Sequence, residues 1–177
     1  SPAEALLRAA YDKKPTSELG WALAREVQER DASQAQAILQ KILSEDPKHA
    51  PAAWKLASMA EASGRVVDAL EFYDRAVKAD PKWTTAWRNR AELRFDRLDG
   101  GVVALRELTQ ASGHKRSTRA LHLSSRMRMA LDDRIGAQRD AEAALKIDAS
   151  YAPAQRTLTK LDLDAGRTDR ALARIAE

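Results

Sequence analysis

The chain has 177 residues, 44% of them hydrophobic and 32% charged, and its 30 Lys and Arg exceed its 26 Asp and Glu to give a formal net charge of +4. This composition favours a folded, helix-rich protein over a disordered one. The lack of cysteine excludes disulfides, thiolate catalysis and sulfur-dependent zinc sites, and no apolar stretch approaches the roughly 20 residues that span a bilayer.

The first predicted element is a helix at the N-terminus. Ser1-Pro2-Ala3-Glu4 has the pattern of a capping box with proline in the first helical turn. The sequence shows no signal peptide pattern. No initiator Met precedes Ser1, so we expect the chain to be an excised or processed fragment.

Further along the chain, landmarks recur with a period of 34 residues. Asp46-Pro47 and Asp80-Pro81 are one period apart, Asp148-Ala149 keeps the register, and Gly64-Arg65 is three periods from Gly166-Arg167. Small residues follow the same grid in two series: Ala35, Ala69, Val103, Ala137 and Ala171, and then Ala57, Ala91, Ser125 and Thr159. Small side chains let crossing helices approach closely, so this grid predicts stacked helical hairpins.

Each period contains two helical patterns with a turn between them. In the second period the patterns run through Trp54–Met59 and Val66–Val77, and Gly64 between them is expected to take the left-handed C-cap conformation. In the third period Leu98 replaces the turn glycine and Gly100-Gly101 follow, which indicates a one-residue insertion. The fourth period has Asp132-Asp133 at this turn.

The spacing and the small-residue grid resemble the tetratricopeptide repeat family. The residues of the second period that match the family motif are Leu56, Ala57, Gly64, Ala69, Tyr73, Ala76 and Pro81. The resemblance implies an all-α fold, a right-handed solenoid of antiparallel helix pairs with about 11 helices. It implies a single solenoid over residues 1–177, with an extra N-terminal helix in 1–15 and repeats at about 16–49, 50–83, 84–117, 118–151 and 152–177, the last one truncated.

The truncated last unit predicts an exposed apolar end. Its apolar positions Leu158, Leu161, Leu172 and Ile175 would have no following helix to cover them, whereas solenoids need polar caps. We expect the natural protein to continue, or this end to contact a partner or a second copy, which makes oligomerisation through the C-terminal end a candidate role.

The sequence contains no motif for catalysis or cofactor binding. A phosphate-binding glycine loop, a dinucleotide fingerprint and a zinc-protease helix motif are all absent. His49 and His114 are expected to be solvated turn residues, and Asp132-Asp133 are explained by the preference of a helix start for acidic side chains. We therefore expect no enzyme, no cofactor and no metal.

The positive charge is concentrated between residues 84 and 131. This span has ten basic and four acidic side chains, for a charge of +6, which leaves −2 for the remainder. The basic residues are Arg88, Arg90, Arg94, Arg97, Arg106, Lys115, Arg116, Arg119, Arg126 and Arg128. Arg119, His122 and Arg126 share one helix face because they are three and four residues apart.

In proteins that resemble this family, the first helix of each unit lines a concave groove. On that alignment the groove would present Trp54, Lys55, Arg88, Asn89, Phe95, Arg119, His122, Arg126, Met129, Arg156 and Lys160, interrupted by Glu92 and Asp96. Arginine forks bind carboxylates through paired hydrogen bonds, so this set suits an acidic ligand. The competing interpretation is a solvated surface whose arginines pair with nearby acids. A pH-sensing role for His122 stays open, because neighbouring cations would lower its pKa.

Three functions compete on these observations. The first is a non-enzymatic protein–protein interaction scaffold that binds an acidic partner segment. The Ala- and Arg-rich composition of the chain, together with its resemblance to known repeat arrays, suggests a setting for this scaffold in bacterial envelope assembly or exopolysaccharide export. The expected location is periplasmic or envelope-associated. The second is nucleic-acid binding, since Trp83, Trp87 and Phe95 lie near the cations. The third is an architectural module that oligomerises or contacts an anionic polysaccharide.

One specialised function of the family fits poorly. Some members hold the carboxylate of chaperone peptides with a clamp of Lys, Asn and Arg. Here Asn89 and Arg119 match two clamp positions, but Trp54, Ser58 and Leu123 occupy the others. A chaperone cofactor is therefore not predicted.

Overall fold

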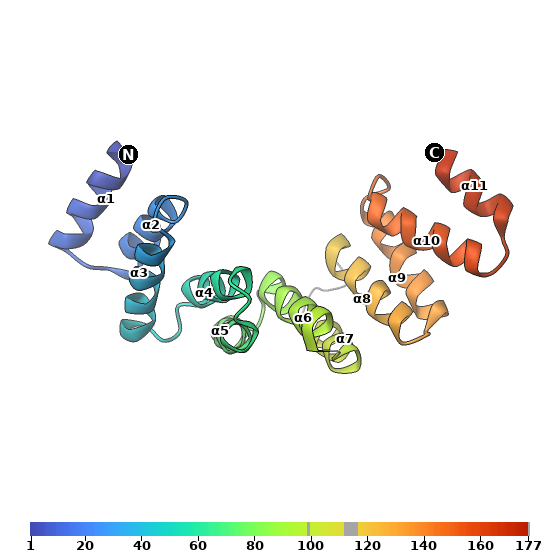
Figure 1. The fold of residues 1–177 in the computed structure, drawn as a ribbon, viewed down its shortest axis with the longest axis horizontal. Coiled ribbons are helices and arrows are strands. Elements are labelled where there is room, and N and C mark those ends of the chain that lie inside the picture. The colour runs from blue at the N-terminus through green and yellow to red at the C-terminus, as the bar shows by residue number, and fades with distance from the viewer. Residues whose placement is uncertain (99, 112–116, 177) are drawn as a thin grey trace. The chain divides into compact units, whose positions relative to one another are not determined.

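The computed structural model describes residues 1–98, 100–111 and 117–176. Within these ranges all regular secondary structure is helical, in eleven α-helices (Figure 1). The chain divides into two compact units, unit 1 over Ser1–Pro81 and unit 2 over Lys82–Glu177. The predicted all-α architecture is confirmed.

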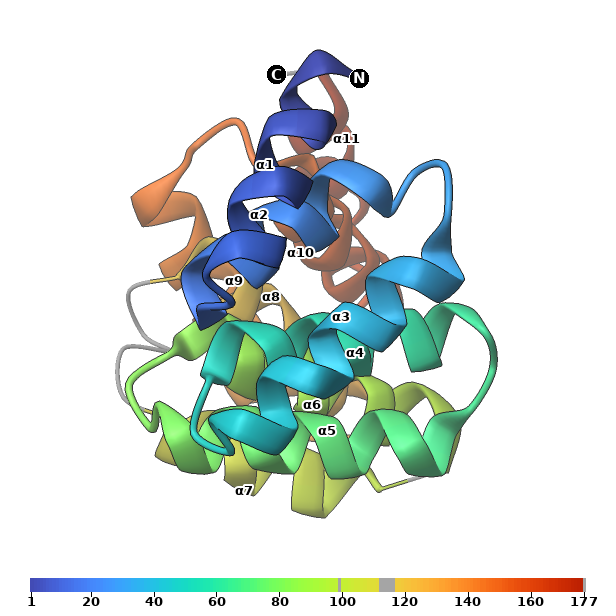
Figure 2. The ribbon, with the colours of Figure 1, turned by 90° about the vertical axis from the view of Figure 1, so that its left-hand side faces the viewer.

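Unit 1 contains five helices, each of which contacts the next along the chain (Figures 1 and 2). They are α1 (Pro2–Lys13), α2 (Ser17–Val27), α3 (Ala32–Glu45), α4 (Ala50–Ala62) and α5 (Val66–Ala79). The predicted capping box at α1 is present, because the Ser1 hydroxyl accepts the Glu4 amide and the Glu4 carboxylate accepts from the Ser1 amino group. Thr16 and Asp31 cap α2 and α3 in the same way through side-chain oxygens.

The described residues of unit 2 form six helices arranged as three hairpins. They are α6 (Thr84–Leu98) with α7 (Gly101–Gln110), α8 (Thr118–Ala130) with α9 (Arg134–Ile147), and α10 (Ala152–Asp164) with α11 (Thr168–Ala176). The first helices of the hairpins also contact one another, since α8 touches both α6 and α10. The one-residue insertion expected in the third period is consistent with α6, which has 15 residues against 13 in α4 and α8.

The small-residue grid forms the tightest parts of both cores. Ala35, Ala69, Ala137 and Ala171 are fully buried, as the close helix crossings require. The prediction was wrong for Val103, which is 46% exposed, and the neighbouring Ala104 is buried in its place. The cause is the insertion: α7 begins at Gly101, one residue later than the period starting from Val66 would place it. Every side chain of α7 is therefore displaced by one position from the 34-residue grid.

Left-handed backbone closes three of the turns between paired helices. Gly64 and Gly166 have φ of 73° and 71°, as expected for glycine after a helix end. Asp132 takes the same conformation with φ 59°. Its short polar side chain tolerates this region better than most, so the absence of glycine in the fourth period does not change the turn.

The structure corrects part of the prediction that the C-terminal hairpin has uncovered apolar side chains. Leu158 and Leu161 are buried in a cluster with Leu121 and Ala137, because α8 and α9 already cover them. Leu172 and Ile175 are exposed as predicted, at 59% and 68%. Buried Asp162 joins α10 to α11: its carboxylate accepts from Arg167 Nε at 2.8 Å and from Arg174 Nε at 2.9 Å. These hydrogen bonds, the Arg167 bond first, hold the pKa of Asp162 below its ordinary value.

Candidate functional site

A small basic pocket lies in unit 2, between α6, α8 and the residue that precedes α10. Its volume is about 150 Å³. The lining residues are Arg88 and Glu92 of α6, Arg119, His122, Leu123 and Arg126 of α8, and Tyr151. Four of the predicted groove residues therefore meet in one place, namely Arg88, Arg119, His122 and Arg126.

The 34-residue period explains why these side chains meet. Arg88, His122 and Arg156 occupy the same position in three successive units, on α6, α8 and α10. Because α8 contacts both α6 and α10, equivalent positions on the three helices form a column. Arg119 and Arg126 flank His122 on the same face of α8. Side chains 34 residues apart are thus brought together by the stacking alone.

Arg126 is not a free cation. Its guanidinium lies 3.3 Å from a Glu92 oxygen and 3.1 Å from an Asp96 oxygen, and it sits 5.6 Å from the centre of the Phe95 ring. Arg90 and Arg94 approach the Glu107 carboxylate of α7 at 3.5 and 3.4 Å. These arginines neutralise acids of their own unit, as the solvated-surface interpretation requires.

Arg88 and Arg119 differ from these paired arginines. In the part of the chain that the structure describes, neither side chain contacts a carboxylate, although Arg88 donates to the Asn89 side-chain oxygen at 3.0 Å. Arg119 is exposed and lines the pocket. Both guanidinium groups retain donors for an anion.

His122 lies half-buried among these cations. Its ring meets the Tyr151 ring edge-on, with centroids 5.7 Å apart. Burial, then the charges of Arg126 and Arg156, lower the pKa of His122 from its ordinary value. The imidazole is therefore neutral in the free protein at neutral pH.

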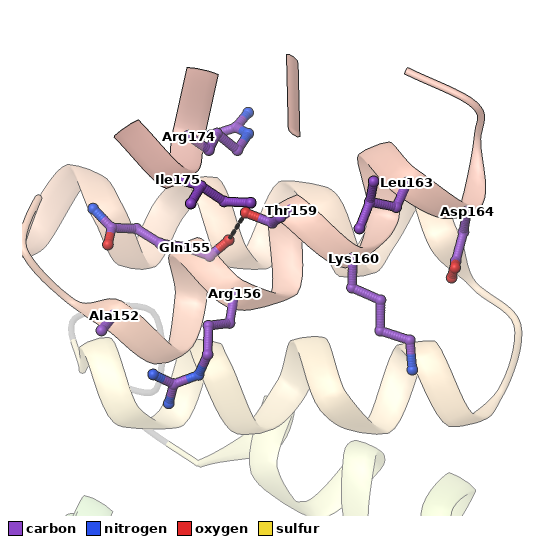
Figure 3. A pocket seen from close by; sticks show the side chains of 9 residues that line it. All are labelled: Ala152, Gln155, Arg156, Thr159, Lys160, Leu163, Asp164, Arg174 and Ile175. Carbon is purple, nitrogen blue, oxygen red and sulfur yellow. Dashed lines mark hydrogen bonds between the residues drawn. The ribbon is translucent and has the colours of Figure 1, made fainter. Parts of the chain in front are cut away.

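A second, larger cavity includes Ala152 in its lining, the residue that follows Tyr151 of the pocket. It lies between α10 and α11, has a volume of about 500 Å³, and is lined by Ala152, Gln155, Arg156, Thr159, Lys160, Leu163, Asp164, Arg174 and Ile175. We call it the α10–α11 cleft. Figure 3 shows Ile175 reaching toward α10 from α11, while Arg156 and Lys160 extend from α10 on its other side. The predicted groove residues Arg156 and Lys160 thus belong to this cleft.

The remaining predicted groove residues lie outside both pockets. Trp54 and Lys55 are half-buried on α4 in unit 1. Phe95 packs against the core of α6–α8, and Met129 packs against the core of α8–α10. Asn89 is half-buried beside Arg88. Lys115, Arg116, Asp99 and His114, which entered the charge count and the turn predictions, lie outside the described residues.

Two predictions about turn residues have different outcomes. His49 is not simply solvated: it is half-buried, its Nδ1 accepts the Ala52 amide at 3.1 Å to cap α4, and its ring lies 6.2 Å from that of Trp21. Asp133 caps α9 by accepting the Gly136 amide and also pairs with Arg128, and Asp132 pairs with Arg134. No cluster of three or more His, Asp or Glu suited to a metal occurs among the described residues.

The sequence analysis missed Tyr151, Leu163 and Ile175 as lining residues. The period itself offered a signal for Tyr151, since His49, Trp83, Ser117 and Tyr151 recur 34 residues apart just before the first helix of each unit. Leu163 and Ile175 were hidden because they line a cavity that depends on the angle between α10 and α11. None of the described helices has the length and apolar character of a membrane span.

Residues 26–93 match the sequence model of the tetratricopeptide repeat family. Over these residues the chain is similar to that family. Solved structures of such proteins share its fold: MamA from Desulfovibrio magneticus RS-1 is 12% identical, with a TM-score of 0.77 over 90% of this chain and 91% of that one. No curated protein matches this chain in sequence.

Two further tetratricopeptide structures have the same fold at low identity. YrrB, described as having an unusual peptide-binding site, is 14% identical with a TM-score of 0.75, over 96% of this chain and 89% of that one. PilW, described as a type IV pilus biogenesis factor, is 18% identical with a TM-score of 0.74, over 91% and 76%. At these identities the likeness establishes the fold.

Proposed function

We propose that this tetratricopeptide repeat chain is a non-enzymatic protein–protein interaction scaffold that binds an acidic segment of a partner at the basic pocket. The observation that carries the proposal is the meeting of Arg88, Arg119 and His122 around one small cavity, with two guanidinium groups that have no carboxylate partner among the described residues. YrrB, which shares the fold, is described as a peptide-binding protein, and this supports the same class of ligand here.

The geometry suits a carboxylate more than a neutral group. A cavity of about 150 Å³ accommodates the end of one acidic side chain, and two guanidinium forks supply paired hydrogen bonds to it. The enclosing walls of Leu123 and Tyr151 reduce the screening of those charges by water. The Arg126 guanidinium is already paired with Glu92 and Asp96. Arg88 and Arg119 are therefore the principal anion-binding groups.

The test is a fluorescence anisotropy titration of a labelled glutamate-rich peptide. The Arg119→Glu variant should bind at least about ten-fold more weakly than the wild type, because reversing an anion-binding charge costs on the order of 1.4 kcal/mol or more. Arg106→Glu is the matched control: Arg106 is also exposed in unit 2 but lies on α7, outside the pocket. Equal weakening by both variants would show a general charge effect and would remove the proposed site.

Two other anions would use the same arginines. An anionic polysaccharide and a single-stranded nucleic acid serve as unlabelled competitors, and either one displacing the peptide at low concentration would reassign the ligand. We propose bacterial envelope assembly or exopolysaccharide export as the setting. The fold shared with PilW, a pilus biogenesis factor, supports an assembly role of this kind.

A further inference from the structure

The basic pocket and the α10–α11 cleft both reach the start of α10. Tyr151 lines the pocket and the next residue, Ala152, lines the cleft. Arg156 connects them further, because it lines the cleft and its charge acts on His122 in the pocket. A ligand that fills the pocket therefore has the cleft beside it.

The cleft has a different chemistry from the pocket. Leu163 and Ile175, which both line the cleft, are 53% and 68% exposed and so offer apolar surface to a ligand. Arg174 is bound to Asp162 and contributes no free charge, whereas Arg156 and Lys160 have no ion pair among the described residues. The lining thus includes two exposed aliphatic side chains and two available cations, and Figure 3 shows that Arg156 and Lys160 extend from α10 on the side opposite Ile175.

We propose that the pocket and the cleft form one composite site, which takes an acidic segment carrying a bulky apolar side chain several residues beyond its acidic group. Leu163 lies eleven residues along α10 from Ala152, about 16 Å at the helical rise, so the acidic and apolar groups of the ligand are separated by a similar length. The acidic group binds at Arg88 and Arg119, and the apolar side chain enters the cleft against Leu163 and Ile175. This inference rests on the proposed function and specifies its ligand. The cations at the cleft favour a partner that is acidic on both sides of its apolar side chain.

Charge also decides against a second copy of the chain as the occupant. Two copies that met through this surface would bring Arg156 and Lys160 toward the same cations of the other copy, and the only acidic residue that lines the described cleft is Asp164. Like charges that are brought together in this way oppose association. An acidic apolar segment has the complementary character.

The experiment compares two labelled peptides on the full chain. One carries glutamates followed by leucines, and the other has serines in place of the leucines. The wild type should bind the leucine peptide about ten-fold more tightly, since burial of one aliphatic side chain is worth roughly that factor. The double variant Leu163→Ser with Ile175→Ser should lose this preference but keep its affinity for the serine peptide.

Leu172→Ser is the matched control. Leu172 is also an exposed aliphatic residue of α11, but it does not line the cleft, so this variant should keep the full preference. Equal binding of both peptides by the wild type would overturn the composite site and leave the proposed function intact. Failure of both peptides to bind would instead refute the proposed function. Concentration-dependent dimerisation that Ile175→Ser abolishes would show that a second copy fills the cleft and would also overturn the inference.

Discussion

His122 links the basic pocket to pH through the charges that surround it. Arg88 and Glu92 of α6, Arg119 and Arg126 of its own helix, and Tyr151 with Arg156 from the α10 side all face it or act on it. Burial, then Arg126 and Arg156, lower its pKa, so the folded protein takes up this proton at a lower pH than an unperturbed histidine does. A bound carboxylate would stabilise the imidazolium and raise that pKa. By linkage, binding then takes up a proton and strengthens as pH falls.

We predict that affinity for the glutamate-rich peptide increases several-fold between about pH 7.5 and about pH 5.5, where the carboxylates of the peptide remain ionised. The His122→Gln variant should show a much flatter profile, because it has no group that titrates in this range. Anisotropy titrations across this pH range provide the measurement. A wild-type profile that is flat, or one that His122→Gln reproduces, would contradict the linkage.

The feature of the site that was hardest to predict from the sequence is which acidic or aromatic side chain each arginine contacts. Arg126 and Glu92 are one period apart, so their contact was implicit in the repeat. The Asp96 contact and the Phe95 contact, however, depend on side-chain direction across the α6–α8 interface. A helix face identifies which residues are neighbours, but it does not identify which charges neutralise one another.

At the scale of elements, the period predicted the helices well because its basis is steric. Ala35, Ala69 and Ala137 are small because helices cross there, and all three are fully buried. The period failed where one residue was inserted, at Val103 and Ala104 in α7. It also could not predict the α10–α11 cleft, because that cavity depends on how α11 is held by Asp162.

The displaced register of α7 leads to a direct prediction about stability. Ala104→Leu should lower the free energy of unfolding by about 1–3 kcal/mol, because a larger side chain would be forced into a filled core. Val103→Leu should change it by less than about 0.5 kcal/mol, since residue 103 is largely exposed. Urea unfolding followed by circular dichroism measures both. The reverse order of effects would mean that the uninterrupted 34-residue grid, and not the displaced one, describes α7.

At the scale of the whole molecule, the proposed binding chemistry lies within unit 2. The basic pocket and the α10–α11 cleft are built by α6, α8, α10 and α11 with the residue that precedes α10. Trp54 and Lys55, predicted from the sequence to share the groove, belong to unit 1. The family resemblance predicted which helix face lines the groove. The packing of the first helix of each hairpin then determines which residues of that face come together.

The proposed function requires that an acidic segment binds where α6, α8 and the start of α10 converge. Amide chemical-shift mapping of the full chain during titration with the glutamate-rich peptide locates the bound segment. We predict that the largest shifts occur on the pocket-facing turns of α6 and α8 and at Tyr151, and that they disappear in Arg119→Glu but not in Arg106→Glu. Largest shifts on α7 and α9, or in unit 1 alone, would contradict the claim.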